Sequence, residues 1–120
     1  MKQELKNAYE KVSTGTELRA GLIEMKNLLK EEKNRRKLAY QLGGDFKILT
    51  RCLSDEDPKV RKNAALVLGA MESDDLVPVL LNAYKKEDTL FVKSAYLKAL
   101  FDLDYEEELP YLKERLQELH

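Results

Sequence analysis

The sequence has little of what a catalytic or disulfide-bonded protein needs. Tryptophan is missing, and histidine and cysteine occur once each. His120 is the last residue, which makes it a poor general base or metal ligand. Cys52 alone forms neither a disulfide framework nor a zinc cluster, and no glycine-rich nucleotide motif is present. We therefore expect a protein that is not an enzyme, with no metal, no cofactor and no small-molecule substrate.

Long hydrophobic runs and charge of one sign are also missing. Residues 1–12 are charged throughout and lack the apolar stretch of a secretion signal. No run approaches the ~18 apolar residues of a membrane span. The net charge is −1, so the overall charge of the chain attracts neither anionic nor cationic partners over long distances. With a single cysteine, these features favour a cytoplasmic protein without membrane contact.

What the chain does have is a helical composition. Charged residues make up 36% of it, with only three prolines and five glycines to break helices. Apolar residues recur at helical spacing, and no stretch alternates with the period of a strand. We therefore predict an all-α fold.

Three nine-residue segments repeat along the chain. They lie at residues 34–42, 60–68 and 92–100, so their spacings are 26 and 32 residues. Each has a basic residue at its second position and leucine at its last. Such periods suit a compact repeat of two helices.

Turn signals divide the chain into helices. Gly43 and Gly44 end one helix, and Asp57 followed by Pro58 begins another. We predict one domain, 1–120, with repeat units at 14–43, 45–71 and 74–103, and terminal helices at 1–12 and 106–120.

The central unit carries a family signature. Residues 53–69 read LSDEDPKVRKNAALVLG, which resembles the HEAT-repeat pattern of bacterial, phycobilisome-lyase-like repeats. Val67 stands where that pattern usually has alanine. The other two units are degenerate, since the first has Glu32 in place of proline and the third has Lys93 in place of arginine. The resemblance covers about residues 17–119.

The resemblance implies a right-handed α-solenoid. It would consist of antiparallel helix pairs, in about three HEAT-like repeats with terminal half repeats. The second helix of each pair would line a concave face. Similar repeats act as scaffolds, and some accompany a larger bacterial enzyme, RNA methyltransferases among them.

Several polar and apolar residues have structural interpretations. The carboxylates at helix starts complement the helix dipole. Arg61 is expected to reach Asp57 or an acid in a neighbouring turn. Cys52 and Tyr96 lie on apolar stripes and are expected in the core, and Gly69 allows close helix packing.

The basic residues are segregated on the predicted second helices. Residues 33–43, 58–71 and 90–101 carry charges of +4, +3 and +2 without any acid. Stacking these helices would place Arg36 beside Lys62, Lys33 beside Lys59, and Tyr40 near Leu66 and Lys98. The candidate partner-binding residues are Lys33, Arg36, Lys37, Tyr40, Lys59, Lys62, Asn63, Phe91 and Lys98.

Two functions compete for this surface. The first is a protein-interaction scaffold, which would bind a protein or an acidic peptide. The alternative is a backbone-directed RNA-binding module, perhaps of a methyltransferase, with a basic stripe that contacts phosphates. The predicted C-terminal helix 106–120 is a half repeat with an apolar stripe. This stripe has three interpretations: the chain continues in a longer protein, the half repeat is a natural cap, or the uncapped end dimerises. We favour the first.

Overall fold

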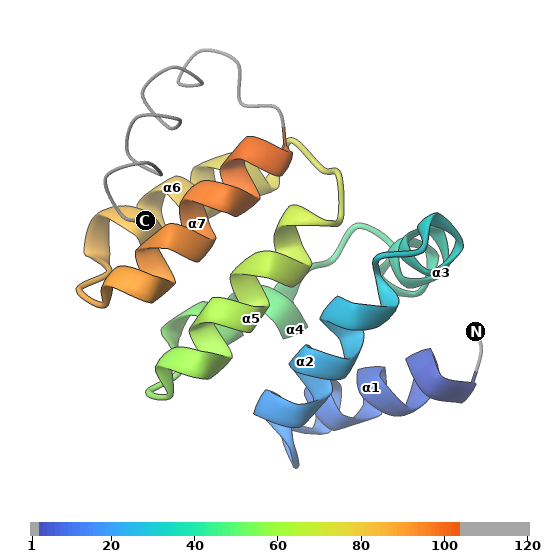
Figure 1. Ribbon diagram of the computed structural model, residues 1–120. Coiled ribbons are helices and arrows are strands. Elements are labelled where there is room, and N and C mark those ends of the chain that lie inside the picture. Colours follow the sequence, from blue (N-terminus) through green and yellow to red (C-terminus); the bar gives the residue numbers. More distant parts are fainter. Residues whose placement is uncertain (1–2, 104–120) are drawn as a thin grey trace.

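The chain folds into helices stacked in two layers. The computed structural model describes residues 3–103, which contain seven α-helices, one 3-10 helix and no strand (Figure 1). This confirms the all-α prediction. The elements are α1 (Gln3–Thr14), α2 (Leu18–Leu28), α3 (Glu32–Leu42), α4 (Lys47–Thr50), η1 (Arg51–Ser54), α5 (Pro58–Gly69), α6 (Leu76–Lys86) and α7 (Leu90–Asp102).

Local signals set the ends of the helices as the sequence predicts. Asp57 caps α5, because its Oδ1 accepts a hydrogen bond of 2.8 Å from the Lys59 amide, and Pro58 occupies the first turn. Gly43 ends α3 with a φ of 58°, in the left-handed region that glycine adopts without strain. None of the helices within 3–103 is long and apolar enough to cross a bilayer.

One layer consists of α2, α5 and α7, which lie side by side (Figure 1). Behind it, α1 packs on α2, α4 and η1 pack on α5, and α6 packs on α7. The two pairs that end in α5 and α7 fall within the predicted segments 45–71 and 74–103. The predicted helix 106–120 lies outside the described residues.

The first pair differs from the prediction. The sequence suggested that α2 pairs with α3, but α2 packs on α1, and α3 makes only sparse contacts with the other described helices. The cause is the apolar stripe of α1, whose Leu5, Ala8 and Val12 are fully buried. Gly21 lets the two helices approach, since a Cβ there would lie 2.8 Å from the Cβ of Lys11.

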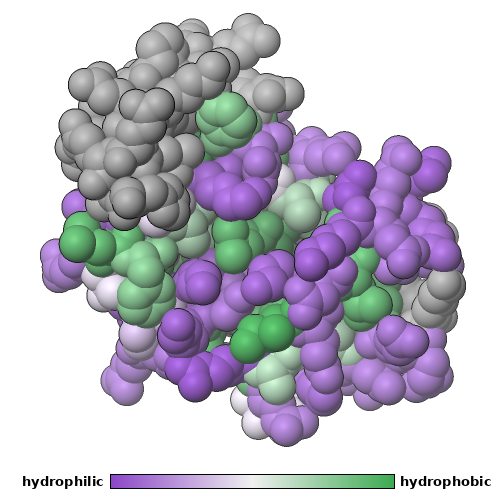
Figure 2. Space-filling view, in the orientation of Figure 1, coloured by the Kyte–Doolittle hydropathy of each residue, from purple (hydrophilic) through white to green (hydrophobic). Residues whose placement is uncertain are grey.

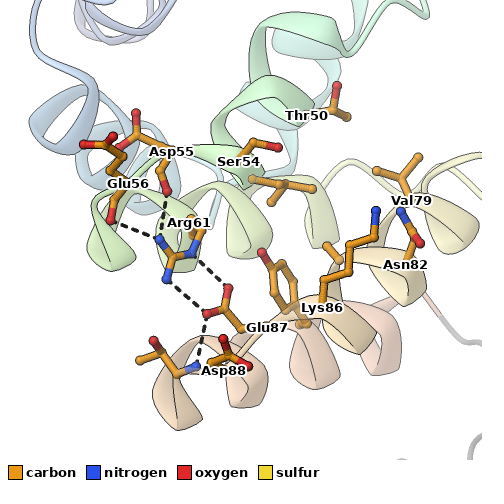
Figure 3. A pocket seen from close by; sticks show the side chains of 14 residues that line it. Thr50, Ser54, Asp55, Glu56, Arg61, Val79, Asn82, Lys86, Glu87 and Asp88 are labelled. Atoms are coloured by element: carbon orange, nitrogen blue, oxygen red, sulfur yellow. Dashed lines mark hydrogen bonds and ion pairs between the residues drawn. The ribbon is translucent and has the colours of Figure 1, made fainter.

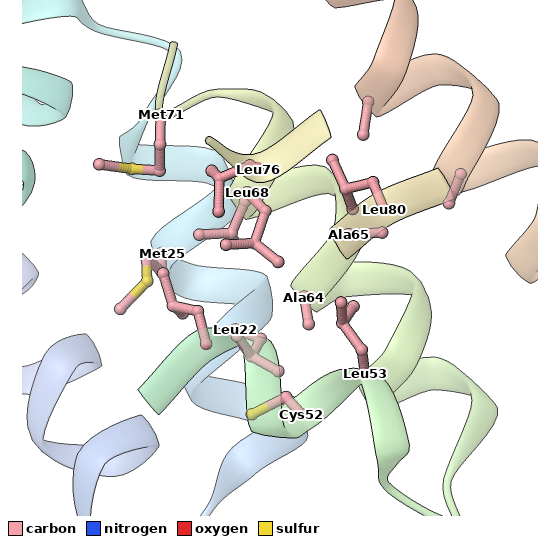
Figure 4. Close-up of a cluster of buried hydrophobic side chains, with 14 of the residues drawn as sticks. Leu22, Met25, Cys52, Leu53, Ala64, Ala65, Leu68, Met71, Leu76 and Leu80 are labelled. Carbon is pink, nitrogen blue, oxygen red and sulfur yellow. The ribbon is translucent and has the colours of Figure 1, made fainter. Parts of the chain in front are cut away.

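The core lies between the two layers. Leu22 and Met25 of α2 meet Cys52 and Leu53 of η1 and the α5 residue Leu68 (Figure 4). Tyr96 is also buried, so its predicted core position is confirmed, and Tyr84 is buried as well. Burial of this apolar cluster is the main source of stability, at roughly 25 cal/mol per Å² removed from water.

Cys52 should be unreactive in the folded protein. Its side chain is buried, its Sγ donates to the Ile48 carbonyl oxygen at 3.4 Å, and burial raises the pKa of the thiol. Since the thiolate is the reactive form, we expect negligible labelling by an aromatic disulfide reagent in native buffer and complete labelling in guanidinium chloride. Rapid labelling of the native chain would contradict this burial.

Candidate binding face

The outward side of the α2, α5 and α7 layer presents a mixed basic and apolar surface. Its residues recur at helical spacing and are exposed or half-buried. We call it the α2/α5/α7 face, and Figure 2 views it directly, with green apolar residues among purple polar ones. It consists of Arg19, Ile23 and Lys26 from α2 with Lys30 in the turn that follows, Lys59, Lys62 and Leu66 from α5 with Ala70 just after it, and Phe91, Ser94 and Lys98 from α7.

Three lysines on this face lie together without a counter-ion. Within residues 3–103, Lys26, Lys30 and Lys62 form no ion pair. Burial lowers the pKa of Lys26, and the charges of Lys62 and Lys30 lower it further. The two helices α2 and α5 therefore bring like charges close enough to interact.

Two predicted contact residues meet at the other side of the face. The Lys59 Nζ lies 4.7 Å from the centroid of the Phe91 ring, a cation–π distance. Phe91 remains 40% exposed, which a contact residue requires. Nearby, Lys98 pairs with Asp102 at 2.9 Å on α7 itself. The α5 and α7 parts of the predicted site therefore lie on one surface.

The α3 part of the predicted site lies elsewhere. Helix α2, and not α3, occupies the place beside α5, so the predicted neighbours Arg36 and Lys62, Lys33 and Lys59, and Tyr40 and Leu66 are not stacked. On α3, Lys33 pairs with Glu31 at 3.2 Å and Arg36 approaches Glu32 at 3.8 Å. Lys37 is half-buried and Tyr40 is almost fully exposed. The basic stripe expected across three second helices is therefore not assembled.

Asn63 does not face a partner either. It is buried, and its Nδ2 donates to the Lys59 carbonyl oxygen at 2.8 Å. Sequence reasoning missed Ile23, Lys26 and Lys30 in its place. The signal that would have found them is the pair Leu18-Arg19 in α2, an apolar residue followed by arginine, which matches Val60-Arg61 in α5.

Arg61 anchors the turn of the following repeat. Its Nε and Nη2 donate to the two carboxylate oxygens of Glu87 at 2.9 and 3.0 Å, and its Nη1 donates to the carbonyl oxygens of Asp55 and Glu56 (Figure 3). The acid that Arg61 reaches is thus the one in a neighbouring turn, while Asp57 pairs with Arg19 at 3.2 Å. Both arginines join one repeat to the next.

The charge on Glu87 is stabilised although the residue is buried. Burial raises the pKa of Glu87, but hydrogen bonds from Arg61 and from the Thr89 amide outweigh this and leave the pKa below its ordinary value. Burial also raises the pKa of Tyr96 beside it to about 12. This cluster lines a cavity of about 600 Å³ between η1 and α6. Arg61 and Glu87, which both line this cavity, are hydrogen-bonded to each other. We therefore interpret them as residues that hold the turn in place and not as ligand-binding groups.

The acidic side chains around these surfaces have structural partners. Among the described residues, no group of three or more His, Cys, Asp or Glu side chains is placed to hold a metal ion. The acidic residues near Asp57 and Glu87 act instead as caps and as partners of arginine.

A comparison with protein families identifies the repeat. The model of HEAT repeats matches residues 46–119, which is more than half of the chain. The chain belongs to the HEAT-repeat family. No curated protein and no solved structure matches it. HEAT repeats commonly serve as protein-interaction scaffolds, because their stacked helices form extended binding surfaces. The finer likeness to phycobilisome-lyase-like repeats stays a prediction.

Proposed function

We propose that this HEAT-repeat chain is a non-catalytic scaffold that binds a segment of another protein on its α2/α5/α7 face. The observation that carries the proposal is the presence of exposed apolar side chains, Ile23 at 38% and Phe91 at 40%, beside lysines that lack ion-pair partners among residues 3–103. Large apolar and aromatic residues beside charge are typical of protein interfaces. A reducing compartment such as the cytoplasm suits the scaffold, since Cys52 is a free thiol.

Replacing Ile23 or Phe91 with serine should remove binding while leaving the fold intact. Both side chains are partly exposed, so their loss costs little stability, whereas a central apolar contact contributes ~1–2 kcal/mol or more to an interface. The measurement is affinity capture from cell extract with the purified chain as bait, followed by identification and quantification of the captured protein. We expect at least about a tenfold loss for each variant.

Val79→Ser is the matched control. Val79 is 38% exposed, the same fraction as Ile23, but it lies on α6 in the other layer. Capture should be unchanged by this substitution. Equal losses for Val79→Ser and Ile23→Ser, or no loss for either face variant, would contradict the proposal.

RNA binding is the second candidate, and the lysine cluster is what favours it. Lys26, Lys30 and Lys62 also suit phosphate oxygens. Two observations favour protein instead. The basic residues of α3 do not extend this cluster into a track, and Lys59 already covers the ring of Phe91, which a base would need for stacking. Capture that disappears after nuclease treatment would reverse this preference.

A further inference from the structure

The lysine cluster differs from Arg19 and Lys98 of the same face in forming no ion pair among residues 3–103. On the same face, Arg19 pairs with Asp57 and Lys98 pairs with Asp102. By contrast, Lys26, Lys30 and Lys62 form no ion pair in the part of the chain that the structure describes. The packing of α2 on α5 brings Lys26 near enough to Lys62 for the two charges to interact, and the charge of Lys30 adds to this. Like charges held together destabilise the free protein, so an anionic partner would gain that energy on binding.

Apolar side chains lie next to these charges. Ile23 precedes Lys26 by one helical turn on α2, and Leu66 follows Lys62 by one turn on α5. Ile23 is exposed and Leu66 is half-buried against the core. The cluster therefore offers three cationic donors beside two aliphatic surfaces.

The positive charge is compact and not extended. Beyond the three lysines, Lys59 is engaged with Phe91, and the remaining charges of the face have their own carboxylates. A nucleic-acid backbone gains affinity from a long series of phosphate contacts. A short run of carboxylates, with an aliphatic side chain among them, matches this patch better.

We propose that Lys26, Lys30 and Lys62 anchor an acidic protein segment whose carboxylates bind the lysines and whose aliphatic residue packs on Ile23 and Leu66. This inference rests on the proposed scaffold function and specifies the chemistry of its partner. The anchor spans α2 and α5, so it depends on their side-by-side packing.

The test uses a fluorescent peptide of Glu-Glu-Leu repeats and its Gln-Gln-Leu counterpart. Fluorescence anisotropy with the full chain should show binding of the first peptide and at least about tenfold weaker binding of the second. Lys26→Glu and Lys62→Glu should each weaken binding of the acidic peptide at least about tenfold, because each substitution replaces an attraction by a repulsion.

Lys85→Glu is the control for overall charge. Lys85 is exposed on α6, away from the face, so this variant should bind the acidic peptide within about twofold of the unaltered chain. Lys26→Glu and Lys62→Glu should melt at temperatures no lower than the unaltered chain, because they relieve repulsion within the cluster. Lost binding therefore reports the anchor and not unfolding.

Three outcomes would overturn the inference. The first is that the glutamine peptide binds as tightly as the acidic peptide. The second is that Lys85→Glu loses as much binding as Lys26→Glu and Lys62→Glu. The third is that an oligouridylate of the same charge binds more tightly than the acidic peptide and displaces it. These outcomes are separate from the scaffold proposal. A captured protein that is lost with Ile23→Ser but retained with Lys26→Glu and Lys62→Glu would leave the scaffold intact and remove this anchor.

Discussion

Replacing Arg61 with methionine should destabilise the chain by about 3–5 kcal/mol, since removal of one partner of a buried ion pair leaves the other charge without compensation. The Glu87 side chain is only 6% exposed and binds Arg61 through both carboxylate oxygens. The substitution also frees the carbonyl oxygens of Asp55 and Glu56. Urea denaturation followed by circular dichroism measures the change in the free energy of unfolding.

Arg36→Met is the matched control for this prediction. Arg36 is also an arginine near a glutamate, but its side chain is 74% exposed and lies 3.8 Å from Glu32. Surface pairs of this kind contribute about 0–1 kcal/mol, so the control should unfold almost as the unaltered chain does. Adding Glu87→Leu to Arg61→Met should recover part of the loss, because the buried charge is then removed. A loss below about 1 kcal/mol for Arg61→Met would contradict the network.

The pH dependence of unfolding gives a second readout of the same pair. The pKa of Glu87 is lowered in the folded state from an ordinary value of 4.5. The unfolded chain therefore binds this proton more readily, so the contribution of Glu87 is present above pH 4.5 and is lost as the pH falls through the native pKa. In Arg61→Met the hydrogen bonds and the charge of Arg61 no longer oppose burial, while the Thr89 and Asp88 amides still lower the pKa of Glu87. The native pKa of Glu87 should therefore rise relative to the unaltered chain, so this part of the acid dependence should shrink.

Local signals explain why the sequence predicted most helices correctly. The Asp57 cap, the proline at the start of α5 and the glycine that ends α3 each act within a few residues. The covering of Phe91 by Lys59 could also be anticipated, because α5 and α7 follow the same repeat pattern. The helix ends need no knowledge of which helices become neighbours, whereas the contact of Lys59 with Phe91 follows from the pairing of α5 with α7.

The pairing of α2 could not be read from local signals. Arg35 donates to the carbonyl oxygens of Leu29 and Lys30 in the way that Arg61 donates to those of Asp55 and Glu56. The same local motif therefore made α3 resemble a second helix of a repeat. What decides the neighbour of α2 is the buried stripe of α1, a contact between separate segments.

The predicted stacking of the basic residues was wrong in part for the same reason. Once α3 was assigned to the stack, its residues Lys33, Arg36 and Tyr40 were placed beside α5, and the lysines in α2 and the turn after it were overlooked. The α5 and α7 residues kept their predicted positions because their own pairing was correct. Charge patterns thus indicated that basic residues gather on second helices, and tertiary packing determined which of them share a face.

Replacing Gly69 with alanine should destabilise the chain by about 1–3 kcal/mol, the usual cost of overpacking a filled core. In a helix, alanine is ordinarily favoured over glycine by roughly 0.5–1 kcal/mol, so the expected change has the opposite sign to the helix propensity. The reason is the contact with α7, where a Cβ at position 69 would lie 2.7 Å from the Ala99 Cα and 2.8 Å from its Cβ. Chemical denaturation measures the difference.

The double variant Gly69→Ala with Ala99→Gly should recover only part of that loss. It removes the clash with the Ala99 Cβ but keeps the close approach to the Ala99 Cα, which belongs to the backbone of α7. A stabilising effect of Gly69→Ala would mean that α5 and α7 lie farther apart than the structure has them. The same spacing between α5 and α7 brings the Lys59 Nζ to 4.7 Å from the centroid of the Phe91 ring. A larger spacing would therefore also contradict this contact on the α2/α5/α7 face.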